Sequence, residues 1–293
     1  MYKSIAELVS TANKENKLIS ELMIDQEMAQ SGETRAIIIE KMSTNLEVMK
    51  QAIERGSNGE GVTSSTGLTG GDAVLLRKYR EKGQSLSGDA NLEAMQYAIA
   101  TNEVNASMGL ICATPTAGSS GTLPGVIFMI QKRLNLSHEK MIQALFTSSA
   151  FGMIVANNAM IAGATGGCQA EVGSASAMAA AAAVEITGGT PEQCAEAFAM
   201  GLSNLLGLVC DPVAGLVEIP CIKRNAIGAV NALTAADMAL AGLSNKVPAD
   251  EVIMAMKDIG ERMPSALRET GVGGLASTPT GQAIKMKIFG ETI

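Results

Sequence analysis

The five cysteines of this sequence are its strongest candidates for metal chemistry, because a cysteine thiolate is a good metal ligand. They are Cys112, Cys168, Cys194, Cys210 and Cys221. No two of them form a Cys-x-x-Cys pair, and their spacing matches no common zinc site. Buried thiols in a helical core would give the same pattern. On spacing alone, core thiols are therefore the better interpretation.

The local sequence around three of the cysteines favours metal binding instead. Cys168 follows two glycines and precedes an expected helix, Cys210 is expected at a helix end before an Asp-Pro pair, and Cys221 falls in the first turn of a helix after a proline. Three helix ends can converge, and the amide groups of helix N-termini stabilise thiolates and other anions. Cys194 is expected in the core, inside a helix among Ala and Phe, whereas Cys112 precedes a polar loop and could take either role.

The composition predicts that helices position these cysteines. The chain has 293 residues, of which 47% are hydrophobic, with 18 Met, 5 Phe, 3 Tyr and no Trp. Ala and Met favour helices, whereas β-branched and aromatic residues favour strands. Few segments alternate apolar and polar residues, and no internal repeat or long linker is visible. The sequence therefore predicts one all-α domain, residues 1–293, in which helices pack closely through small residues.

Local signals divide the chain into helices and loops. A capping box, S-x-x-E at Ser4 and Glu7, opens the first short helix, and Thr190 with Pro191 opens a later helix that runs to about Leu208. The other expected helices are Leu18–Met28, Glu33–Arg55 with Gly56 as its stop, Ala73–Glu81, Ala90–Met108, a long uncharged region beginning at Ser137, Glu171–Ile186, Ile219–Leu240, Pro248 to about Arg262, and a short C-terminal helix. Three glycine-rich loops separate them: Ser57–Asp72, Ala113–Gly125 and Gly271–Gly281.

Charge and hydropathy argue against two classes of protein. The net charge of −7 is unlike that of a nucleic-acid-binding protein, which would carry a basic patch. Met141–Ala170 has no charged residue and is long enough to cross a bilayer, but Thr, Ser, Asn, Gln and Gly interrupt it, so a buried core helix is expected instead. The N-terminal residues lack the apolar core of a secretory signal. We therefore expect a cytoplasmic protein with reduced cysteines and without nucleic-acid or membrane partners.

Five segments of the chain resemble, in order, the catalytic domain of the iron–sulfur L-serine dehydratases. Two look like the cluster-binding motifs of that family: G-A-T-G-G-C-Q-A-E at 163–171 and C-D-P-V-A-G-L-V-E-I-P-C at 210–221. The others are S-S-T-G-L-T-G-G-D at 64–72, N-E-V-N-A-S-M-G at 102–109 and A-T-P-T-A-G-S-S-G-T-L-P-G at 113–125. The resemblance spans most of the chain and matches the alpha chain of the two-chain form, in which a separate beta chain carries the regulatory-type domain.

The resemblance implies a reaction and a cofactor. Cys168, Cys210 and Cys221 would hold three irons of a 4Fe-4S cluster, and the fourth iron, without a cysteine, would act as a Lewis acid on the hydroxyl and carboxylate of L-serine. A base would remove the α-proton, and the product 2-aminoacrylate would give pyruvate and ammonia. Pyridoxal phosphate would not be needed, because iron does the activation.

The polar loops have a matching role in this interpretation, since backbone N–H groups at helix starts can bind the carboxylate of a substrate. The expected pocket residues are Ser64, Ser65, Thr66, Gly70 and Gly71 from the first loop, and Thr114, Thr116, Gly118 and Ser119 from the second. Tight turns between helices would explain each loop equally well.

The sequence lacks an evident general base. His138 is the only histidine, and it is expected in an exposed first helical turn after Ser137. The resemblance implies that the base is a histidine in an S-S-H-T segment of the other domain, whereas this chain has S-S-T at 64–66. We therefore expect the serine dehydratase beta chain to supply the base, and this chain alone to turn over little serine. Single-chain relatives can end in a cysteine that reaches the cluster, but this sequence ends F-G-E-T-I.

Two alternatives remain open on sequence grounds. A related cluster-dependent L-cysteine desulfidase would eliminate hydrogen sulfide instead of water, and turnover of L-cysteine against L-serine would separate the two. An alternative of a different class is a small-molecule-binding or assembly subunit without a cluster, which would be colourless after anaerobic purification.

Overall fold

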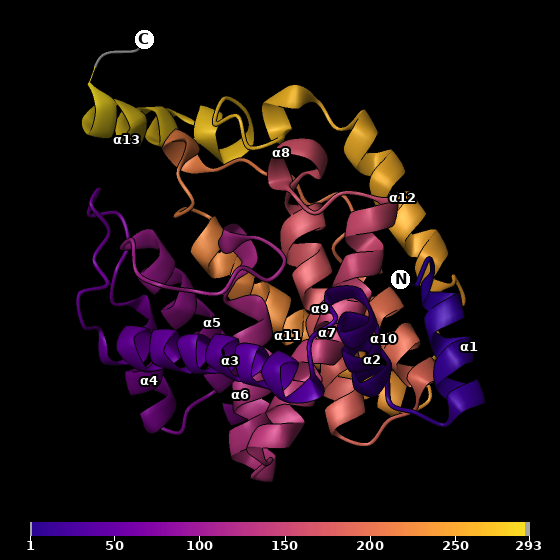
Figure 1. The fold of residues 1–293 in the computed structure, drawn as a ribbon. Helices are drawn as coiled ribbons and strands as arrows, with labels where there is room; N and C mark the ends of the chain where they lie inside the picture. The colour runs from indigo at the N-terminus through magenta and orange to yellow at the C-terminus, as the bar shows by residue number, and fades with distance from the viewer. Residues whose placement is uncertain (1, 291–293) are drawn as a thin grey trace.

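The computed structural model describes residues 2–290, and the regular elements within them are all helices, as the sequence predicts (Figure 1). The α-helices are α1 Ile5–Glu15, α2 Ile19–Ser31, α3 Arg35–Asn58, α4 Asp72–Glu81, α5 Asp89–Ala106, α6 Thr122–Leu134, α7 His138–Asn158, α8 Gly163–Gly166, α9 Ser174–Ile186, α10 Pro191–Ser203, α11 Cys221–Leu240, α12 Ala249–Arg262 and α13 Pro279–Phe289. The only extended pairing in these residues is an isolated bridge between Cys210 and Arg268. The last three residues, where the sequence predicts no cysteine ligand, lie outside the described range.

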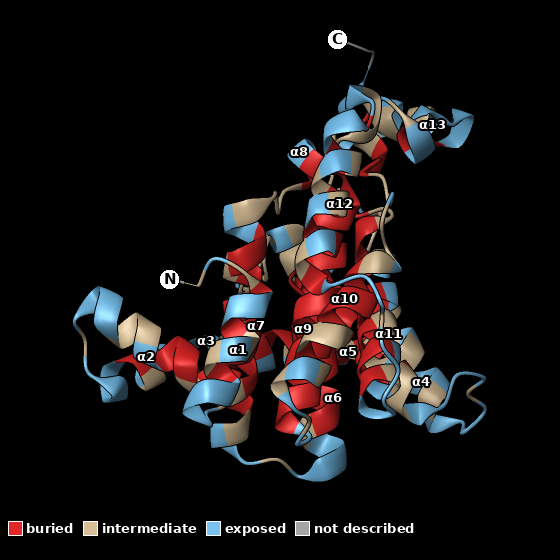
Figure 2. Cartoon of the chain, turned by 90° about the vertical axis from the view of Figure 1, so that its right-hand side faces the viewer, coloured by how far each residue is buried: buried red, intermediate tan, exposed pale blue. Residues whose placement is uncertain are grey.

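Helix α9 forms the centre of the molecule. Its sequence is S-A-S-A-M-A-A-A-A-A-V-E-I, and every residue of it is buried. Helices α6, α7, α10 and α11 pack around it, and Figure 2 shows the buried residues concentrated along these central helices. Because Ala side chains are small, neighbouring helix backbones approach closely. The expectation of tightly packed helices with small contact residues is therefore confirmed.

A second layer forms on α5, which packs against α3, α4, α6 and α11. The predicted stop at Gly56 is wrong, since α3 continues to Asn58 and ends at Gly59, whose φ is 79°. Gly56 is instead buried against the backbone of Ala100, where a Cβ atom would overlap the carbonyl group. The glycine is thus required by the close contact of α3 with α5 rather than by a helix end.

Helix α6 is absent from the sequence-based assignment, which extends the second polar loop to Gly125. The loop in fact ends before Thr122, and Pro124 lies in the first turn of α6, where a proline is well tolerated. Gly125 lies against α5, where an added Cβ would be 2.7 Å from the carbonyl oxygen of Ala94. In the sequence alone, Pro124 and Gly125 both favour a loop.

The other boundaries differ for local reasons. Helix α10 ends at Ser203 rather than near Leu208, α11 begins at Cys221 rather than Ile219, and α13 begins at Pro279 inside the third predicted loop. The uncharged stretch 141–170 is not one helix: α7 ends at Asn158, and a loop, α8 and a π-turn follow. Among the described residues, no helix has both the length and the apolar character needed to cross a membrane.

Candidate metal centre and its polar loops

Cys168, Cys210 and Cys221 lie in segments of three different backbone conformations. Cys168 follows Gly167, whose φ of 76° turns the chain after α8, and it precedes the π-turn Gln169–Gly173 that leads into α9. Cys221 is the first residue of α11. Cys210 is not at a helix end, contrary to expectation. It lies in an extended segment whose N–H donates to the carbonyl of Leu267 at 2.8 Å and whose carbonyl accepts from the N–H of Glu269 at 2.7 Å.

The three thiols are buried and close enough to influence one another. Cys168 and Cys210 are each 3% exposed and Cys221 is 8% exposed. Burial raises the pKa of Cys168 to about 11 and that of Cys221 to about 12, and it also raises the pKa of Cys210. After burial, the negative charge of the Cys168 thiolate is the largest cause that raises the pKa of Cys210 and of Cys221. Three thiolates gathered in this way repel one another unless a cation lies among them.

Arg224, in the first turns of α11, holds the backbone around this group. Its guanidinium donates to the carbonyl oxygen of Val209 at 2.8 Å and pairs with the carboxylate of Asp211 at 2.8 Å. These contacts fix the residues on either side of Cys210. The same positive charge lowers the pKa of Cys168 and of Cys221, although burial outweighs it at both thiols.

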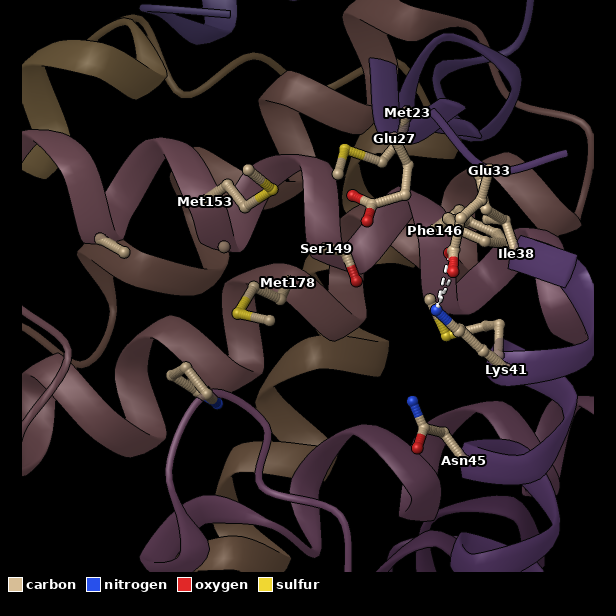
Figure 3. Close-up of a pocket in the computed structure, with 14 residues that line it drawn as sticks. Met23, Glu27, Glu33, Ile38, Lys41, Asn45, Phe146, Ser149, Met153 and Met178 are labelled. Atoms are coloured by element: carbon tan, nitrogen blue, oxygen red, sulfur yellow. Dashed lines mark hydrogen bonds and ion pairs between the residues drawn. The ribbon is translucent and has the colours of Figure 1, made fainter. Parts of the chain in front are cut away.

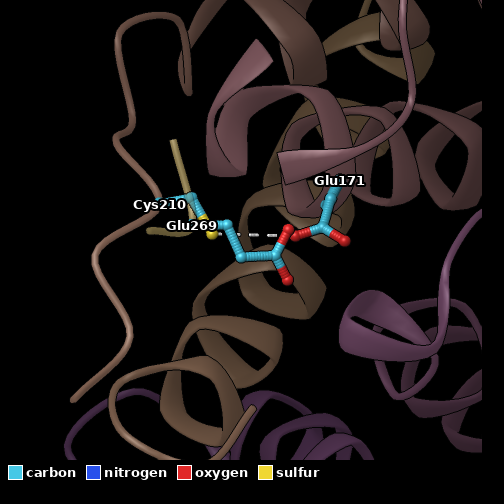
Figure 4. A group of neighbouring side chains, drawn as sticks. All are labelled: Glu171, Cys210 and Glu269. Atoms are coloured by element: carbon cyan, nitrogen blue, oxygen red, sulfur yellow. Dashed lines mark hydrogen bonds between the residues drawn. The ribbon is translucent and has the colours of Figure 1, made fainter. Parts of the chain in front are cut away.

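Two carboxylates face Cys210 and were not among the predicted site residues. Figure 4 shows the side chains of Cys210, Glu171 and Glu269 pointing toward one another from separate segments, and their ligand atoms all lie within 4.8 Å of one another. The Sγ atom of Cys210 is 4.0 Å from Oε2 of Glu171. Burial raises the pKa of Glu171. The hydrogen bond from Thr116 lowers this pKa, but burial is the larger effect. Glu171 ends the motif at 163–171, whereas nothing in the sequence marked Glu269.

The donor set suits an iron–sulfur cluster. Three thiols are soft ligands of the kind that holds such clusters, and the carboxylates beside Cys210 would complement positive charge on a metal. The remaining cysteines lie elsewhere. Cys194 is fully buried in α10, as expected for a core residue, and the Sγ atom of Cys112 lies 3.4 Å from the carbonyl oxygen of Asn45 on α3.

The first polar loop reaches the segment between Cys210 and Cys221. The hydroxyls of Thr66 and Thr69 donate to the two oxygens of Glu218 at 2.8 and 2.7 Å. Ser64 is buried and bonds within its own loop, whereas Ser65 is exposed. Gly70 and Gly71 have φ values of 139° and 94°, and Gly71 immediately precedes α4. The glycines thus permit the turn that presents the α4 N-terminus.

The second polar loop reaches Glu171. The hydroxyl of Thr116 donates to Oε1 of Glu171 at 2.7 Å, and a Cβ added to Gly118 would be 3.3 Å from the same oxygen. Thr114 precedes the cis peptide bond to Pro115, and its carbonyl accepts from the hydroxyl of Ser119 at 3.0 Å. Ser119 is fully buried and serves the loop itself. Of the nine predicted pocket residues, Thr66 and Thr116 therefore bond to the buried glutamates of the cysteine segments, and Gly118 lies against Glu171.

His138 lies away from this group. It begins α7 on the surface, where its Nε2 atom is 2.9 Å from the hydroxyl oxygen of Ser43 on α3. Ser137 caps α7 by accepting from the N–H of Lys140, as the sequence predicts.

A cavity of about 390 Å³ opens between α2, α3 and α7, and it is distinct from the cysteine site (Figure 3). Its wall is mainly apolar, with Met23, Met153 and Met178 among its residues, and an ion pair between Lys41 and Glu33 lies at its side. No cysteine lines it, and Pro115 alone connects it to the second polar loop.

Comparison with known proteins places this arrangement in context. A family model described as the serine dehydratase alpha chain matches residues 14–276. The chain is 60% identical over 293 residues to the "Probable L-serine dehydratase, alpha chain" of Bacillus subtilis, covering 100% of this chain and 97% of the relative. It is 43% identical over 291 residues to the "L-serine dehydratase, alpha chain" of Peptoniphilus asaccharolyticus, with 99% of each covered. It is also 40% identical over 277 residues to the "L-serine dehydratase" of Streptomyces coelicolor, covering 92% of this chain but 59% of that protein.

Proposed function

We propose, from the premise that the chain belongs to the serine dehydratase alpha chain family, that it is the iron–sulfur subunit of an L-serine dehydratase. The reaction would convert L-serine to pyruvate and ammonia without pyridoxal phosphate. The observation that carries the proposal is the gathering of three buried thiols, Cys168, Cys210 and Cys221, of which Cys210 lies beside two carboxylates. A location in the cytoplasm follows from the same proposal, because clusters and thiols need a reducing compartment.

Cys168, Cys210 and Cys221 would hold a 4Fe-4S cluster. When bound, such a cluster with one iron free of cysteine supplies a Lewis acid that makes the hydroxyl of serine a better leaving group. The protein contributes burial, which excludes water, and Arg224, which holds the backbone at Val209 and Asp211 on either side of Cys210.

Serine also carries a carboxylate and an ammonium group, and the residues around the cysteines offer complements to both. The backbone of the Thr114–Ser119 loop and the N–H groups near Gly70 and Gly71 would bind the carboxylate. Glu171 and Glu269 would attract the ammonium group, since both are acidic and no lysine or arginine among residues 2–290 forms an ion pair with either.

The base that removes the α-proton would come from the beta chain. The only histidine of this sequence is His138, and it bonds to Ser43 at the surface. The names of two relatives, each an "alpha chain", support a two-chain enzyme of this kind. The purified subunit would then carry its cluster but remain nearly inactive.

The deciding experiment compares turnover of L-serine and L-cysteine by the anaerobically purified chain, alone and with the beta chain. We expect a coloured protein that is nearly inactive alone and releases pyruvate from L-serine once the partner is added. Faster release of hydrogen sulfide from L-cysteine would favour a desulfidase. A colourless protein without iron or sulfide would contradict the cluster. Full-rate serine turnover without a partner would contradict the partner's role as the source of the base.

A further inference from the structure

Two buried glutamates join the polar loops to the cysteine segments in the same way. Glu171 stands at the third position after Cys168, and Glu218 stands at the third position before Cys221. Each accepts a hydrogen bond from a threonine hydroxyl, Glu171 from Thr116 and Glu218 from Thr66. Among residues 2–290 neither glutamate has an ion pair with a lysine or arginine, so these hydroxyl groups are the principal partners of the two carboxylates.

Glu218 is the stronger of the two connections. It is 6% exposed, and both of its oxygens are used, one by Thr66 at 2.8 Å and the other by Thr69 at 2.7 Å. A buried carboxylate that loses such donors is left poorly solvated, so the bonds hold the loop firmly as long as Glu218 stays in place.

The backbone of Glu218 is hydrogen-bonded to the start of α11. Its carbonyl oxygen accepts from the N–H of Ile222 at 3.1 Å, and its N–H donates to the carbonyl of Leu216 at 2.8 Å. Cys221 lies within that same first turn. A rearrangement of Cys221 on gaining or losing a metal group would therefore be passed to the carboxylate that holds Thr66 and Thr69.

The end of the first polar loop has a separate anchor that does not involve the cysteines. Glu103 on α5 is fully buried and accepts from the N–H groups of Asp72 and Ala73 at 2.6 and 3.3 Å, at the N-terminus of α4. The loop is thus fixed at its end by the helical core, while its middle is held by Glu218 together with the loop's own hydrogen bonds between Ser64, Gly67 and Thr69. The attachment through Glu103 is therefore independent of the cysteine segment, whereas the attachment through Glu218 is part of that segment.

We propose that Glu218 is a positioning residue that makes the order of the Ser64–Gly71 loop depend on the state of the Cys210–Cys221 segment. With the cluster in place, Glu218 holds Thr66 and Thr69, and the loop is shaped to bind the carboxylate of serine. Without the cluster, the segment relaxes and the loop opens. The inference rests on the proposed function and adds to it a link between cluster occupancy and substrate binding.

The experiment measures amide hydrogen exchange of residues 64–71 in cluster-loaded and cluster-free protein. We expect these amides to exchange about tenfold more slowly in the loaded protein, which corresponds to about one hydrogen bond to a charged group. Replacing both hydroxyls, in Thr66→Val with Thr69→Val, should abolish the difference while iron and sulfide content stay unchanged. The pair Thr66→Ser with Thr69→Ser keeps the hydroxyls and should restore it.

A matched control is available in the helical core. Glu185 on α9 is 3% exposed and accepts from the hydroxyl of Thr147 and from the N–H groups of Ile19 and Ser20, none of which belongs to a polar loop. Thr147→Val should reduce the overall stability of the protein. It should not change the difference in amide exchange rate at residues 64–71 between cluster-loaded and cluster-free protein. An equal loss in this variant would mean that the effect of the Thr66 and Thr69 changes reflects stability alone.

Kinetics give a second readout. With the beta chain present, the double valine variant should raise the KM for L-serine about tenfold and change kcat far less, because only the loop that binds the substrate is loosened. Equal exchange at residues 64–71 in loaded and cluster-free wild-type protein would overturn the link, even if the enzyme binds a cluster and dehydrates serine. A wild-type protein that binds no cluster would instead overturn the proposed function.

Discussion

The Sγ atom of Cys210 lies 4.0 Å from Oε2 of Glu171, whose other oxygen accepts the hydroxyl hydrogen of Thr116 at 2.7 Å. One carboxylate thus bridges an expected metal ligand and an expected substrate loop. Because Glu171 is buried, this bridge is shielded from solvent and from screening by salt. The cysteine segments and the polar loops therefore form one continuous polar site within a helical protein.

The assignment of the three ligands predicts a specific pattern of cluster loss. Cys168→Ser, Cys210→Ser and Cys221→Ser should each lower the iron and sulfide content of the anaerobically purified protein, because serine is a poorer ligand for iron than a thiolate. Cys112→Ser and Cys194→Ser are the controls. The thiol of Cys112 contacts the carbonyl oxygen of Asn45 on α3, and Cys194 is buried within α10. Cluster loss in the controls, with retention in the other three, would show that the assignment is wrong.

The carboxylates at Glu171 and Glu269 predict a defect in substrate affinity. Glu171→Gln and Glu269→Gln each remove one negative charge beside Cys210, so the KM for L-serine should rise about tenfold in each variant, through weaker attraction of the ammonium group. Glu261→Gln, an exposed change in the last turn of α12, is the control. Steady-state kinetics at matched iron content provide the test. An unchanged KM in both variants would argue that the ammonium group binds elsewhere.

Replacing Asn225 on α11 should strongly destabilise the protein, because this residue is fully buried and holds the second polar loop to the start of α6. Its Oδ1 atom accepts from the N–H groups of Gly121 and Thr122, each at 3.1 Å, and its Nδ2 atom donates to the carbonyl of Gly118 at 2.7 Å. Asn225→Ala should lower the free energy of unfolding by about 2–4 kcal/mol, because several buried groups lose their partners.

The control for Asn225 is Asn204→Ala, since Asn204 is exposed and its Nδ2 atom donates to Oδ1 of Asn231 at 3.0 Å. We expect a change of less than about 0.5 kcal/mol in this variant. Urea unfolding of both variants measures the difference. Similar stabilities for the two would show that the buried bonds of Asn225 contribute little.

Glu93 on α5 predicts a pH-dependent contribution to stability. Burial would raise the pKa of this carboxyl, but hydrogen bonds from Lys132 and Tyr97 and the charge of Arg80 outweigh burial and hold the pKa below its ordinary value of 4.5. Since the folded-state pKa lies below the unfolded value, the stabilisation is complete above about pH 4.5 and is lost as the pH falls through the folded-state pKa.

Glu93→Gln should accordingly be less stable than wild type by about 2 kcal/mol at neutral pH, between the values typical of exposed and buried ion pairs. Thermal unfolding at a series of pH values checks the sign, because the gap between the two proteins should narrow as the pH falls below 4.5. A gap that stays constant down to strongly acidic pH would mean that the effect comes from packing and not from charge.

The sequence by itself determined the features that depend on neighbouring residues. Ser4 caps α1 by accepting from the N–H of Glu7 at 3.0 Å, and Thr190 and Gln193 form the complete capping box that opens α10. A short signal of this kind satisfies the free N–H groups of the first helical turn without help from the rest of the chain. The all-helical class and the core position of Cys194 followed in the same way from local composition.

Only the tertiary structure decided which distant residues meet. Glu218 joins Thr66 across 152 positions of sequence and Glu171 joins Thr116 across 55. Both glutamates lie within the cysteine motifs, but no local pattern shows which distant residues they contact. Gly56 likewise reads as a helix stop, although its lack of a side chain serves the contact with Ala100. These contacts depend on how the helices pack around α9, and packing is set by the shapes of all the buried side chains together. The cysteines could therefore be recognised from their motifs, whereas the contacts of Glu171 and Glu269 with Cys210 emerged only from the fold.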